Sequence, residues 1–213
     1  KMIQGAVMGY GTVGSGVVEV IEKNKKEINK KSNDELNIKY ILDLRDFPGD
    51  PYESKIVHDV EQILGDPEVQ IICETMGGLK PAYDFTKRAL LSGKSVCTSN
   101  KELVAAHGPE LIQIAHEHNC NYLFEASVGG GIPIIRPLKQ CLAANEIDEV
   151  IGIMNGTTNY ILTKMFEDNM DFDEALAKAT ELGYAEADPT ADIEGLDAGR
   201  KAAILASIAF HSR

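Results

Sequence analysis

Gly9-Tyr10-Gly11-Thr12-Val13-Gly14 is the stretch that decides how the first part of this chain folds. It fits the pattern GxGxxG and stands between two segments of different periodicity. The apolar run Ile3–Met8 before it predicts a strand, and Val13–Lys30 after it predicts a helix. A bare glycine pattern is weak, but a strand, this pattern and a helix in that order are typical of a dinucleotide-binding turn.

The three glycines have separate tasks in such a turn. Gly9 permits the tight turn, Gly11 lets the backbone approach a pyrophosphate, and Gly14 lets the helix pack closely on the sheet. The free N–H groups at the helix N-terminus add a positive dipole end for the anion. We therefore predict that Tyr10, Thr12 and Val13 also contact the dinucleotide. The alternative is a glycine turn without a ligand.

The rest of the first two-thirds of the chain alternates continuous apolar runs with helical stretches. This alternation predicts parallel βαβ units, and the fold class is α/β, a Rossmann-type doubly wound parallel sheet. The predicted strands are Ile38–Leu42, Val69–Cys73, Ser95–Thr98 and Tyr122–Phe124, and the predicted helices are Pro81–Leu91 and Pro109–Asn119.

The pattern changes after about residue 130. Glu146–Met154 mixes polar and apolar residues, which predicts a strand of a second sheet with one exposed face. Three helices follow, predicted at Thr158–Asn169, Asp173–Leu182 and Leu196–Phe210. We place the boundary near Pro133: a dinucleotide-binding domain at 1–133, then at 134–213 part of an α+β substrate and dimerisation domain, incomplete at its C-terminus. The chain is expected to be a fragment of a longer protein.

Composition excludes several classes of partner. The 213 residues are 44% hydrophobic and carry a net charge of −12, so nucleic acid and anionic membranes are not expected as partners. No apolar run is long enough to span a membrane. The four cysteines are widely spaced without a CxxC pair, which is typical of reduced thiols in a cytoplasmic protein.

Asp43 and Arg45 follow the second predicted strand, where an acidic residue normally holds the ribose hydroxyls. Asp43 lies further from Gly14 than the usual spacing of about 20 residues, because of the polar stretch Glu22–Asn37. Asp43 favours an unphosphorylated ribose, whereas Arg45 can accept a 2′-phosphate. The choice between NAD and NADP therefore stays open.

Five further stretches carry a resemblance to a known family. They are Glu74-Thr75-Met76-Gly77-Gly78, Thr98-Ser99-Asn100-Lys101-Glu102-Leu103, Phe124–Pro133, Asn155–Leu162, and Leu182–Pro189 continuing to Gly195–Lys201. In this order and spacing they closely resemble homoserine dehydrogenases. The resemblance implies NAD(P)-dependent interconversion of aspartate 4-semialdehyde and L-homoserine, on the route to threonine, methionine and isoleucine. It also implies a homodimer.

Lys201 is the first candidate for the chemistry. Apolar residues surround it in nearly every direction of its predicted helix, so that helix is expected to be buried. Asp197 lies at i−4 on the same face. In the resembling family the matching lysine is the catalytic proton donor or acceptor. The alternative is an exposed surface ion pair. Lys101, which follows the strand predicted at Ser95–Thr98, resembles the family's second lysine, which stabilises the developing alkoxide and also touches the cofactor. The alternative is a solvated loop lysine.

The resemblance implies further roles. Glu186 and Asp197 match residues that bind substrate, and Glu186 fits the substrate ammonium group. The neighbouring Asp188, Asp192 and Glu194 are interpreted as a solvated acidic surface. Thr75 and Gly183 match cofactor-contacting positions, although Gly183 is also a helix C-cap.

The glycine-rich loop before Pro133 has an irregular backbone, and free carbonyls suit a hard cation. The matching loop of the family binds a monovalent cation, usually sodium, through residues corresponding to Glu125, Val128, Gly130 and Ile132. The alternative is a glycine hinge without metal.

Two other functions remain open. One is another two-domain semialdehyde or hydroxy-acid dehydrogenase with a similar first domain, and the other is a non-catalytic fragment that binds a nicotinamide dinucleotide.

Overall fold

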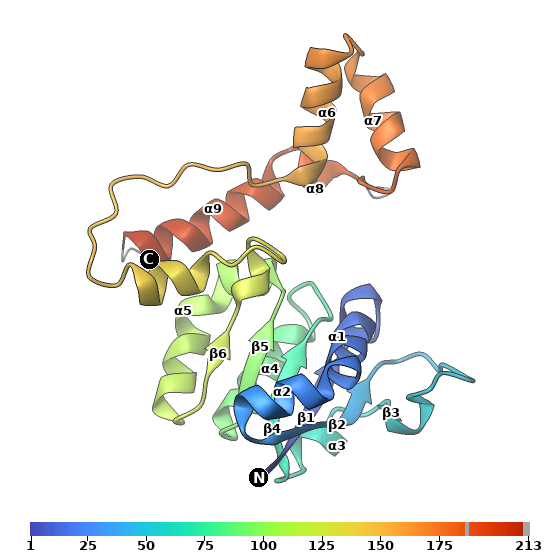
Figure 1. Cartoon of the computed structure of the whole chain (residues 1–213), viewed down its shortest axis with the longest axis vertical. Helices are drawn as coiled ribbons and strands as arrows, with labels where there is room; N and C mark the ends of the chain where they lie inside the picture. Colours follow the sequence, from blue (N-terminus) through green and yellow to red (C-terminus); the bar gives the residue numbers. More distant parts are fainter. Residues whose placement is uncertain (186–187, 211–213) are drawn as a thin grey trace. The chain divides into compact units, whose positions relative to one another are not determined.

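The computed structural model describes residues 1–185 and 188–210 of the chain. They belong to two compact units, Lys1–Ile132 and Pro133–Arg213 (Figure 1). The two units are described separately below.

A six-stranded, wholly parallel sheet forms the centre of the first unit, in the order β3-β2-β1-β4-β5-β6. The order reverses between β1 and β4, which is the switch point where doubly wound sheets bind ligands. The predicted α/β fold class is confirmed. The strands are β1 (Met2–Met8), β2 (Glu35–Leu42), β3 (Ile56–Val57), β4 (Val69–Glu74), β5 (Ser95–Thr98) and β6 (Tyr122–Leu123).

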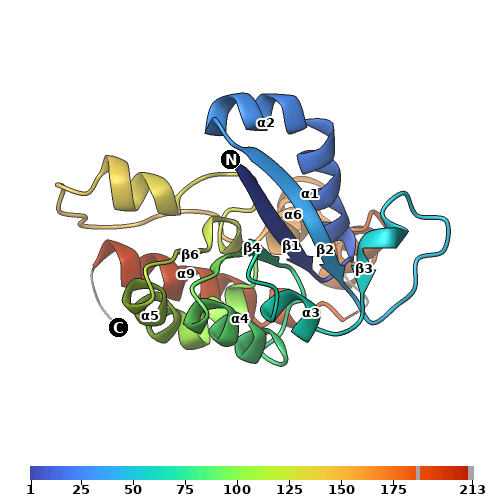
Figure 2. The same ribbon diagram turned by 90° about the horizontal axis from the view of Figure 1, so that it is seen from below.

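Helices cover both faces of this sheet (Figure 2). One face carries α1 (Thr12–Lys23) and α2 (Lys25–Ser32), and the other carries α3 (Glu61–Leu64), α4 (Ala82–Leu91) and α5 (Lys101–Glu117). Short 3₁₀ turns occur at η1 (Glu53–Lys55) and η2 (Glu125–Ser127). Val18 of α1 packs against Val7, Ile38 and Ile41 of the sheet, all buried, and this cluster fixes the helix that follows the glycine turn.

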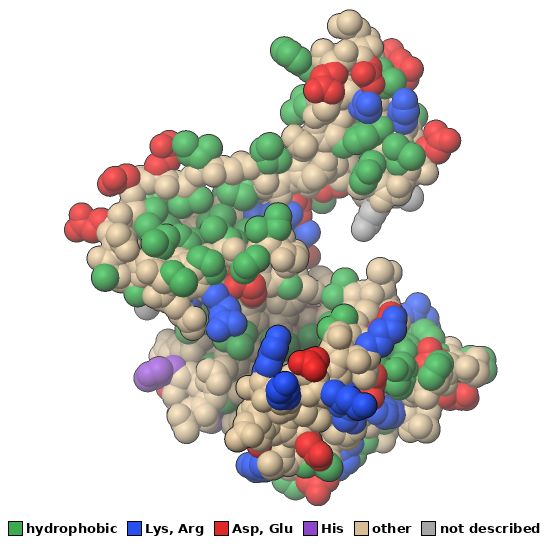
Figure 3. Space-filling model, in the orientation of Figure 1, with side chains coloured by type: hydrophobic (Ala, Val, Ile, Leu, Met, Phe, Trp, Pro, Cys, Tyr) green, Lys and Arg blue, Asp and Glu red, His purple; other side chains and the backbone are tan. Residues whose placement is uncertain are grey.

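The single helix predicted at Val13–Lys30 is two helices. Asn24 ends α1 outside the helical region, at φ −100° and ψ 15°, and its side-chain amide donates to the carbonyl of Val20 at 3.0 Å. The lysine-rich α2 buries no residue, so packing does not hold it in line with α1. Figure 3 shows Lys and Arg side chains gathered on the surface of this first unit.

The helix predicted from Pro109 begins at Lys101 instead. The Asn100 side chain accepts a hydrogen bond from the Leu103 N–H at 3.0 Å, which is the geometry of an N-cap. Pro109 lies inside the helix and costs it one backbone hydrogen bond. Proline is favoured in the first turn of a helix, but here the asparagine further upstream supplies the cap, so the helix begins there and continues through the proline.

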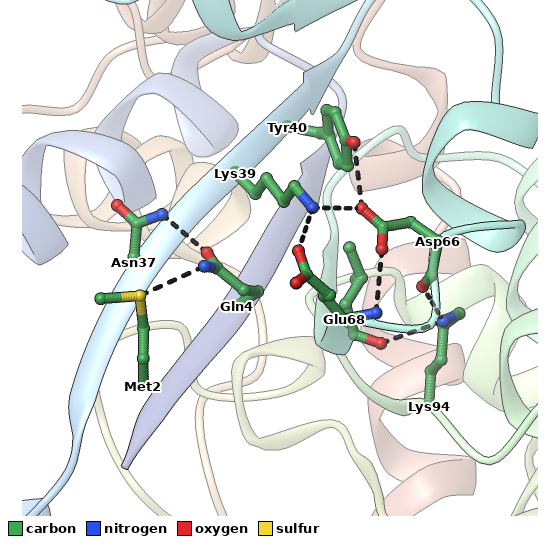
Figure 4. A network of polar contacts seen from close by, with 9 residues as sticks. Met2, Gln4, Asn37, Lys39, Tyr40, Asp66, Glu68 and Lys94 are labelled. Atoms are coloured by element: carbon green, nitrogen blue, oxygen red, sulfur yellow. Dashed lines mark hydrogen bonds and ion pairs between the residues drawn. The ribbon is translucent and has the colours of Figure 1, made fainter.

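A polar network holds the amino ends of β4 and β5 (Figure 4). Lys39 of β2 pairs with Asp66 at 2.6 Å and with Glu68 at 2.5 Å. Lys94, which is buried, donates to the carbonyls of Asp66 at 2.6 Å and Val69 at 3.0 Å. Burial lowers the pKa of Lys94. These contacts tie three strands together at the edge opposite their carboxyl ends.

The second unit, in its described part, consists of helices and loops. Ile161, Ala175, Ala179 and Ala185 form its buried cluster, in which α6 packs against α7 (Figure 1). The elements are a π-helical turn η3 (Pro137–Cys141) and the helices α6 (Gly156–Glu167), α7 (Phe172–Glu181), α8 (Thr190–Ile193) and α9 (Leu196–Ala209). No helix in the described residues of either unit is long and apolar enough to cross a membrane.

The strand predicted at Glu146–Met154 is wrong. The segment has no regular secondary structure, and Ile151 and Ile153 are 84% and 78% exposed. A strand needs a neighbour for its backbone hydrogen bonds, and the described residues of this unit contain none. A mixture of polar and apolar residues is compatible with a half-exposed strand, but it does not supply the partner strand.

Candidate functional site

A cavity of about 510 Å³ lies in the first unit beyond the carboxyl ends of β1, β2 and β4. Predicted site residues from three separate turns line it together: Gly9, Tyr10 and Gly11 after β1, Asp43 and Arg45 after β2, and Thr75 after β4. Thr12, Val13 and Gly14 begin α1 next to this lining without belonging to it. The structure thus brings six of the predicted residues to one cavity at the switch point of the sheet.

The glycine turn has the geometry predicted for a phosphate-binding loop. Gly9 has φ +95°, a left-handed conformation that L side chains rarely adopt. A Cβ at Gly14 would lie 1.8 Å from the carbonyl oxygen of Gly9, so α1 can approach the strand this closely only with glycine there. At Gly11 a Cβ would meet no atom within 4 Å, which leaves open space on the side where a phosphate would approach.

Thr75 holds this turn from the neighbouring strand. Its hydroxyl lies 3.1 Å from the Met8 carbonyl and 3.0 Å from the Gly9 carbonyl, and donates to them, while its N–H donates to the Met8 carbonyl at 2.8 Å. The side chain that was predicted to contact the cofactor therefore also fixes the carbonyl beside which α1 packs.

Asp43 and Arg45 form a pair at the cavity wall. The Tyr10 N–H donates to Asp43 Oδ2 at 2.9 Å, and the Arg45 guanidinium donates to both Asp43 oxygens at 2.9 and 3.0 Å. These bonds, the Arg45 side chain first, hold the pKa of Asp43 well below its usual value of 3.8. The pairing therefore stabilises the folded state above about pH 4 and is lost on acidification.

Arg45 is the more accessible member of that pair, with 64% of its side chain exposed against 10% for Asp43. Its guanidinium also lies 5.0 Å from the centre of the Phe47 ring. The acidic residue of the cavity is thus neutralised by a cation that itself faces solvent.

Lys101 is the first residue of α5 and is half-buried, so the alternative of a solvated loop lysine is wrong. It follows the carboxyl end of β5, as predicted, but it does not line the 510 Å³ cavity.

The predicted cation loop is also in the first unit. Glu125 begins the 3₁₀ turn η2, Val128 is buried, Gly130 has φ +58° and Ile132 is 73% exposed. The Ile132 N–H donates to the Gly129 carbonyl at 2.9 Å, which closes a tight turn. The described residues hold no cluster of three or more His, Cys, Asp or Glu side chains suited to a metal. Cation binding by this loop stays a prediction.

In the second unit, Lys201 is held by two oxygens. Its Nζ lies 2.8 Å from Asp197 Oδ2 and donates to the Met154 carbonyl at 2.9 Å. Only 17% of the Lys201 side chain and 5% of the Asp197 side chain are exposed. The pair is therefore a buried ion pair rather than the exposed surface pair that the spacing also allowed.

Asn155 completes this group, and the sequence analysis gave it no role. Its amide nitrogen donates to Asp197 at 2.9 Å and to Asp192 at 2.6 Å, while its oxygen accepts from the Thr158 N–H at 2.8 Å and caps α6. Asp192 is thus bound to this cluster, and its interpretation as part of a solvated acidic surface was wrong. The available signal was an asparagine directly before the helix residues Gly-Thr-Thr.

The helix that carries Lys201 was predicted to be buried on all sides, but only one of its faces is buried. The buried face of α9 includes Asp197, Ile204, Leu205 and Ala209, whereas Leu196 is 51% exposed. Gly183 follows α7 with φ +77°, as a left-handed C-cap residue would. Glu186, predicted to bind substrate, lies outside the described residues.

Comparison with known proteins assigns both units. The family model of the homoserine dehydrogenase NAD-binding domain matches residues 9–125, and that of homoserine dehydrogenase matches residues 133–213. The chain belongs to the homoserine dehydrogenase family. The homoserine dehydrogenase of Synechocystis sp. is 45% identical over 97% of this chain and 48% of its own length. That of Bacillus subtilis is 42% identical over 99% and 49%.

Solved homoserine dehydrogenase structures have the same fold. The protein of Thiobacillus denitrificans aligns with a TM-score of 0.92 at 40% identity, over 99% of this chain and 49% of that chain. A hyperthermophilic archaeal homoserine dehydrogenase in complex with NADPH aligns with a TM-score of 0.86 at 29% identity, over 98% and 70%. The chain spans about half the length of the curated homoserine dehydrogenases that it matches.

Proposed function

We propose that the protein containing this chain catalyses the NAD(P)-dependent interconversion of aspartate 4-semialdehyde and L-homoserine. The observation that carries the proposal is the Lys201–Asp197 ion pair, 2.8 Å long and almost buried, in a chain whose two units match homoserine dehydrogenases. A buried lysine is costly unless it is paired, and such groups are more common at functional sites than elsewhere.

In this proposal the bound dinucleotide supplies or accepts the hydride at the substrate carbon. Lys201 gives a proton from its Nζ to the carbonyl oxygen of the semialdehyde, which becomes the homoserine hydroxyl, and takes that proton back in the oxidation. Asp197 and the Met154 carbonyl orient the Nζ. By its match to the family's second lysine, Lys101 is assigned the stabilisation of a developing alkoxide.

Substrate binding is assigned to Asp197 and Glu186. Asp197 is already held by Lys201 and Asn155, so its carboxylate has a fixed orientation before substrate arrives. Glu186 is proposed for the substrate ammonium group because an ammonium needs an anionic partner. Gly183 and Thr75 are proposed to contact the dinucleotide.

We propose that the cavity accepts NADP as well as NAD. Arg45 neutralises Asp43, which removes the repulsion that an acidic residue would exert on a 2′-phosphate, and its exposed guanidinium can bind that phosphate. A similar chain, the archaeal relative, was solved with NADPH.

Replacing Arg45 with Ala should weaken NADP binding by about 10- to 100-fold, the range for losing a hydrogen bond to a charged group. NAD affinity should change by less than about threefold, because Asp43 keeps its bond from the Tyr10 N–H. Fluorescence titration of the reduced dinucleotides measures both constants. Equal losses for the two dinucleotides would show that Arg45 does not read the 2′-phosphate.

Four other properties extend the proposal: a homodimer, a sodium ion on the loop of Glu125, Val128, Gly130 and Ile132, a cytoplasmic location, and a place in threonine, methionine and isoleucine biosynthesis. The free state of all four cysteines supports the cytoplasmic assignment. The others rest on the family.

The test of the proposed function is turnover of homoserine by the full-length protein with NAD and with NADP, followed by the absorbance of the reduced nicotinamide. Turnover supports the proposal and gives the dinucleotide preference. Dinucleotide binding without turnover of homoserine or of other hydroxy acids would instead favour a non-catalytic binding protein. Turnover of another hydroxy acid alone would favour a different two-domain dehydrogenase.

A further inference from the structure

Glu74 is a buried carboxylate that no step above uses. It is the last residue of β4 and has no exposed surface. A buried charge must be compensated by hydrogen bonds. Its Oε1 accepts from the Met76 N–H at 2.8 Å, and its Oε2 accepts from the Thr98 hydroxyl at 2.6 Å. Met76 stands on the turn that follows β4, and Thr98 is the last residue of β5.

The contacts continue beyond Thr98. The Thr98 hydroxyl oxygen accepts from the Asn100 N–H at 2.9 Å. The Asn100 side chain then donates to the Gly78 carbonyl at 2.6 Å and accepts from the Leu103 N–H at 3.0 Å. One continuous network therefore joins the turn at residues 75–78 to the first turn of α5, and we call it the Glu74 network.

Backbone groups fix the direction of the hydrogen bonds at Met76 and Asn100. The N–H groups of Met76 and Asn100 can only donate. The Thr98 oxygen accepts from the Asn100 N–H, and the Thr98 hydroxyl donates to Glu74 Oε2. Residue 74 must therefore supply two acceptors, which an ionised carboxylate does. A glutamine offers one acceptor and one donor of nearly the same shape, and leaves a buried donor without a partner in either orientation.

The two turns that the Glu74 network connects carry proposed functional groups. Thr75 and Met76 line the dinucleotide cavity, and Lys101 directly follows Asn100. A displacement of about 1 Å in a reacting group can cost about 100-fold in rate. Both turns lie at the carboxyl ends of neighbouring strands, where a shared carboxylate can hold them in register.

We propose that Glu74 is a positioning residue. Through Thr98 and Asn100 it fixes the position of Lys101 relative to Thr75 and Met76, which form part of the wall of the dinucleotide cavity. The inference rests on the proposed function for its kinetic consequence, but its structural content does not depend on homoserine turnover.

The test is Glu74→Gln in the full-length protein, compared with Thr98→Val, Thr98→Ser and Glu68→Gln. Glu74→Gln and Thr98→Val should lower kcat by about 10- to 100-fold while KM for homoserine changes by less than about threefold. Thr98→Ser keeps the hydroxyl and should retain activity within about twofold of the parent. Glu68→Gln makes the same chemical change at an exposed glutamate before β4 and should leave kcat unchanged.

Amide hydrogen exchange gives a second readout. A general loss of stability alone would not confine faster exchange to particular amides. Exchange at Met76, Asn100 and Leu103 should become at least about tenfold faster in Glu74→Gln, whereas amides in the β1–β2 region keep their protection. Unchanged kcat with a lowered melting temperature would overturn the proposal and leave Glu74 a purely structural residue. Unchanged exchange at the three amides would also overturn it.

The two proposals fail in different ways. If the parent protein does not turn over homoserine, the proposed function is wrong. Localised faster exchange in Glu74→Gln, absent from Glu68→Gln, would then still support positioning by Glu74, and uniform exchange would still overturn it.

Discussion

Lys201→Ala should lower kcat for homoserine oxidation by about 10²- to 10⁴-fold, the usual contribution of a positioned proton donor or acceptor. The dissociation constant of the dinucleotide should change by less than about twofold, because the residues that line the cavity all belong to the first unit and Lys201 belongs to the second. Steady-state kinetics at saturating substrate, together with dinucleotide titration, measure the two quantities.

The chain offers a matched control for this substitution. Lys164 of α6 forms an ion pair of the same i,i+4 spacing, in the opposite chain order, with Asp168 at 2.8 Å, but the carboxylate is 40% exposed rather than 5%. Lys164→Ala removes a lysine and a helical ion pair of the same spacing, and should leave both stability and kcat nearly unchanged, because exposed ion pairs contribute little. Equal kcat in Lys201→Ala and in the parent protein would refute the role assigned to Lys201.

Gly14→Ala should weaken dinucleotide binding by about 10- to 100-fold and reduce the free energy of unfolding by about 1–3 kcal/mol. The added Cβ would fall 1.8 Å from the Gly9 carbonyl oxygen and 2.8 Å from Thr75 Oγ1. Because the nearer obstacle is backbone, α1 must move away from the turn, and the N–H groups offered to the phosphate move with it. Titration with the dinucleotide and chemical denaturation measure the two losses.

Gly16→Ala is the control for that substitution. Gly16 lies on the same helix, but a Cβ there meets no atom within 4 Å. Alanine is the better helix former by about 1 kcal/mol, so this variant should be as stable as the parent or more so, with unchanged dinucleotide affinity. Losses of similar size in both variants would mean that α1 tolerates no change at all, and that the contact with Gly9 is not the cause.

The sheet was predictable because its signals are local. Buried parallel strands appear as short continuous apolar runs, and the predicted bounds Ser95–Thr98 agree with β5. Two of the errors arose where packing against other elements decides the outcome. Glu146–Met154 mixes polar and apolar residues but has no neighbouring strand among the described residues. Asn24 interrupts a helix that has nothing to pack against beyond that point.

The candidate site divides in the same way. Asp43 and Arg45 could be predicted because a doubly wound sheet brings the residues after its strands to one edge, and Thr75 because it matches a cofactor-contacting position of the resembling family. Asn155 could be predicted as a helix cap but not as a partner of Asp197 and Asp192, since it meets them through a loop path that no periodicity encodes. Glu74 is a similar case, because the residues next to it in the sequence do not predict that Thr98, 24 residues later, donates to it.

The polar network around Lys39, Asp66 and Lys94 has a consequence for redesign. It fastens the sheet at the amino ends of β4 and β5, and the 510 Å³ cavity lies beyond the opposite ends. The groups that anchor the sheet and the groups that choose a ligand are therefore different residues on different turns. The turns after β2 and β4 can therefore be altered to change dinucleotide preference while those anchors stay intact. For the same reason, dinucleotide preference can change during evolution without a compensating gain of stability elsewhere.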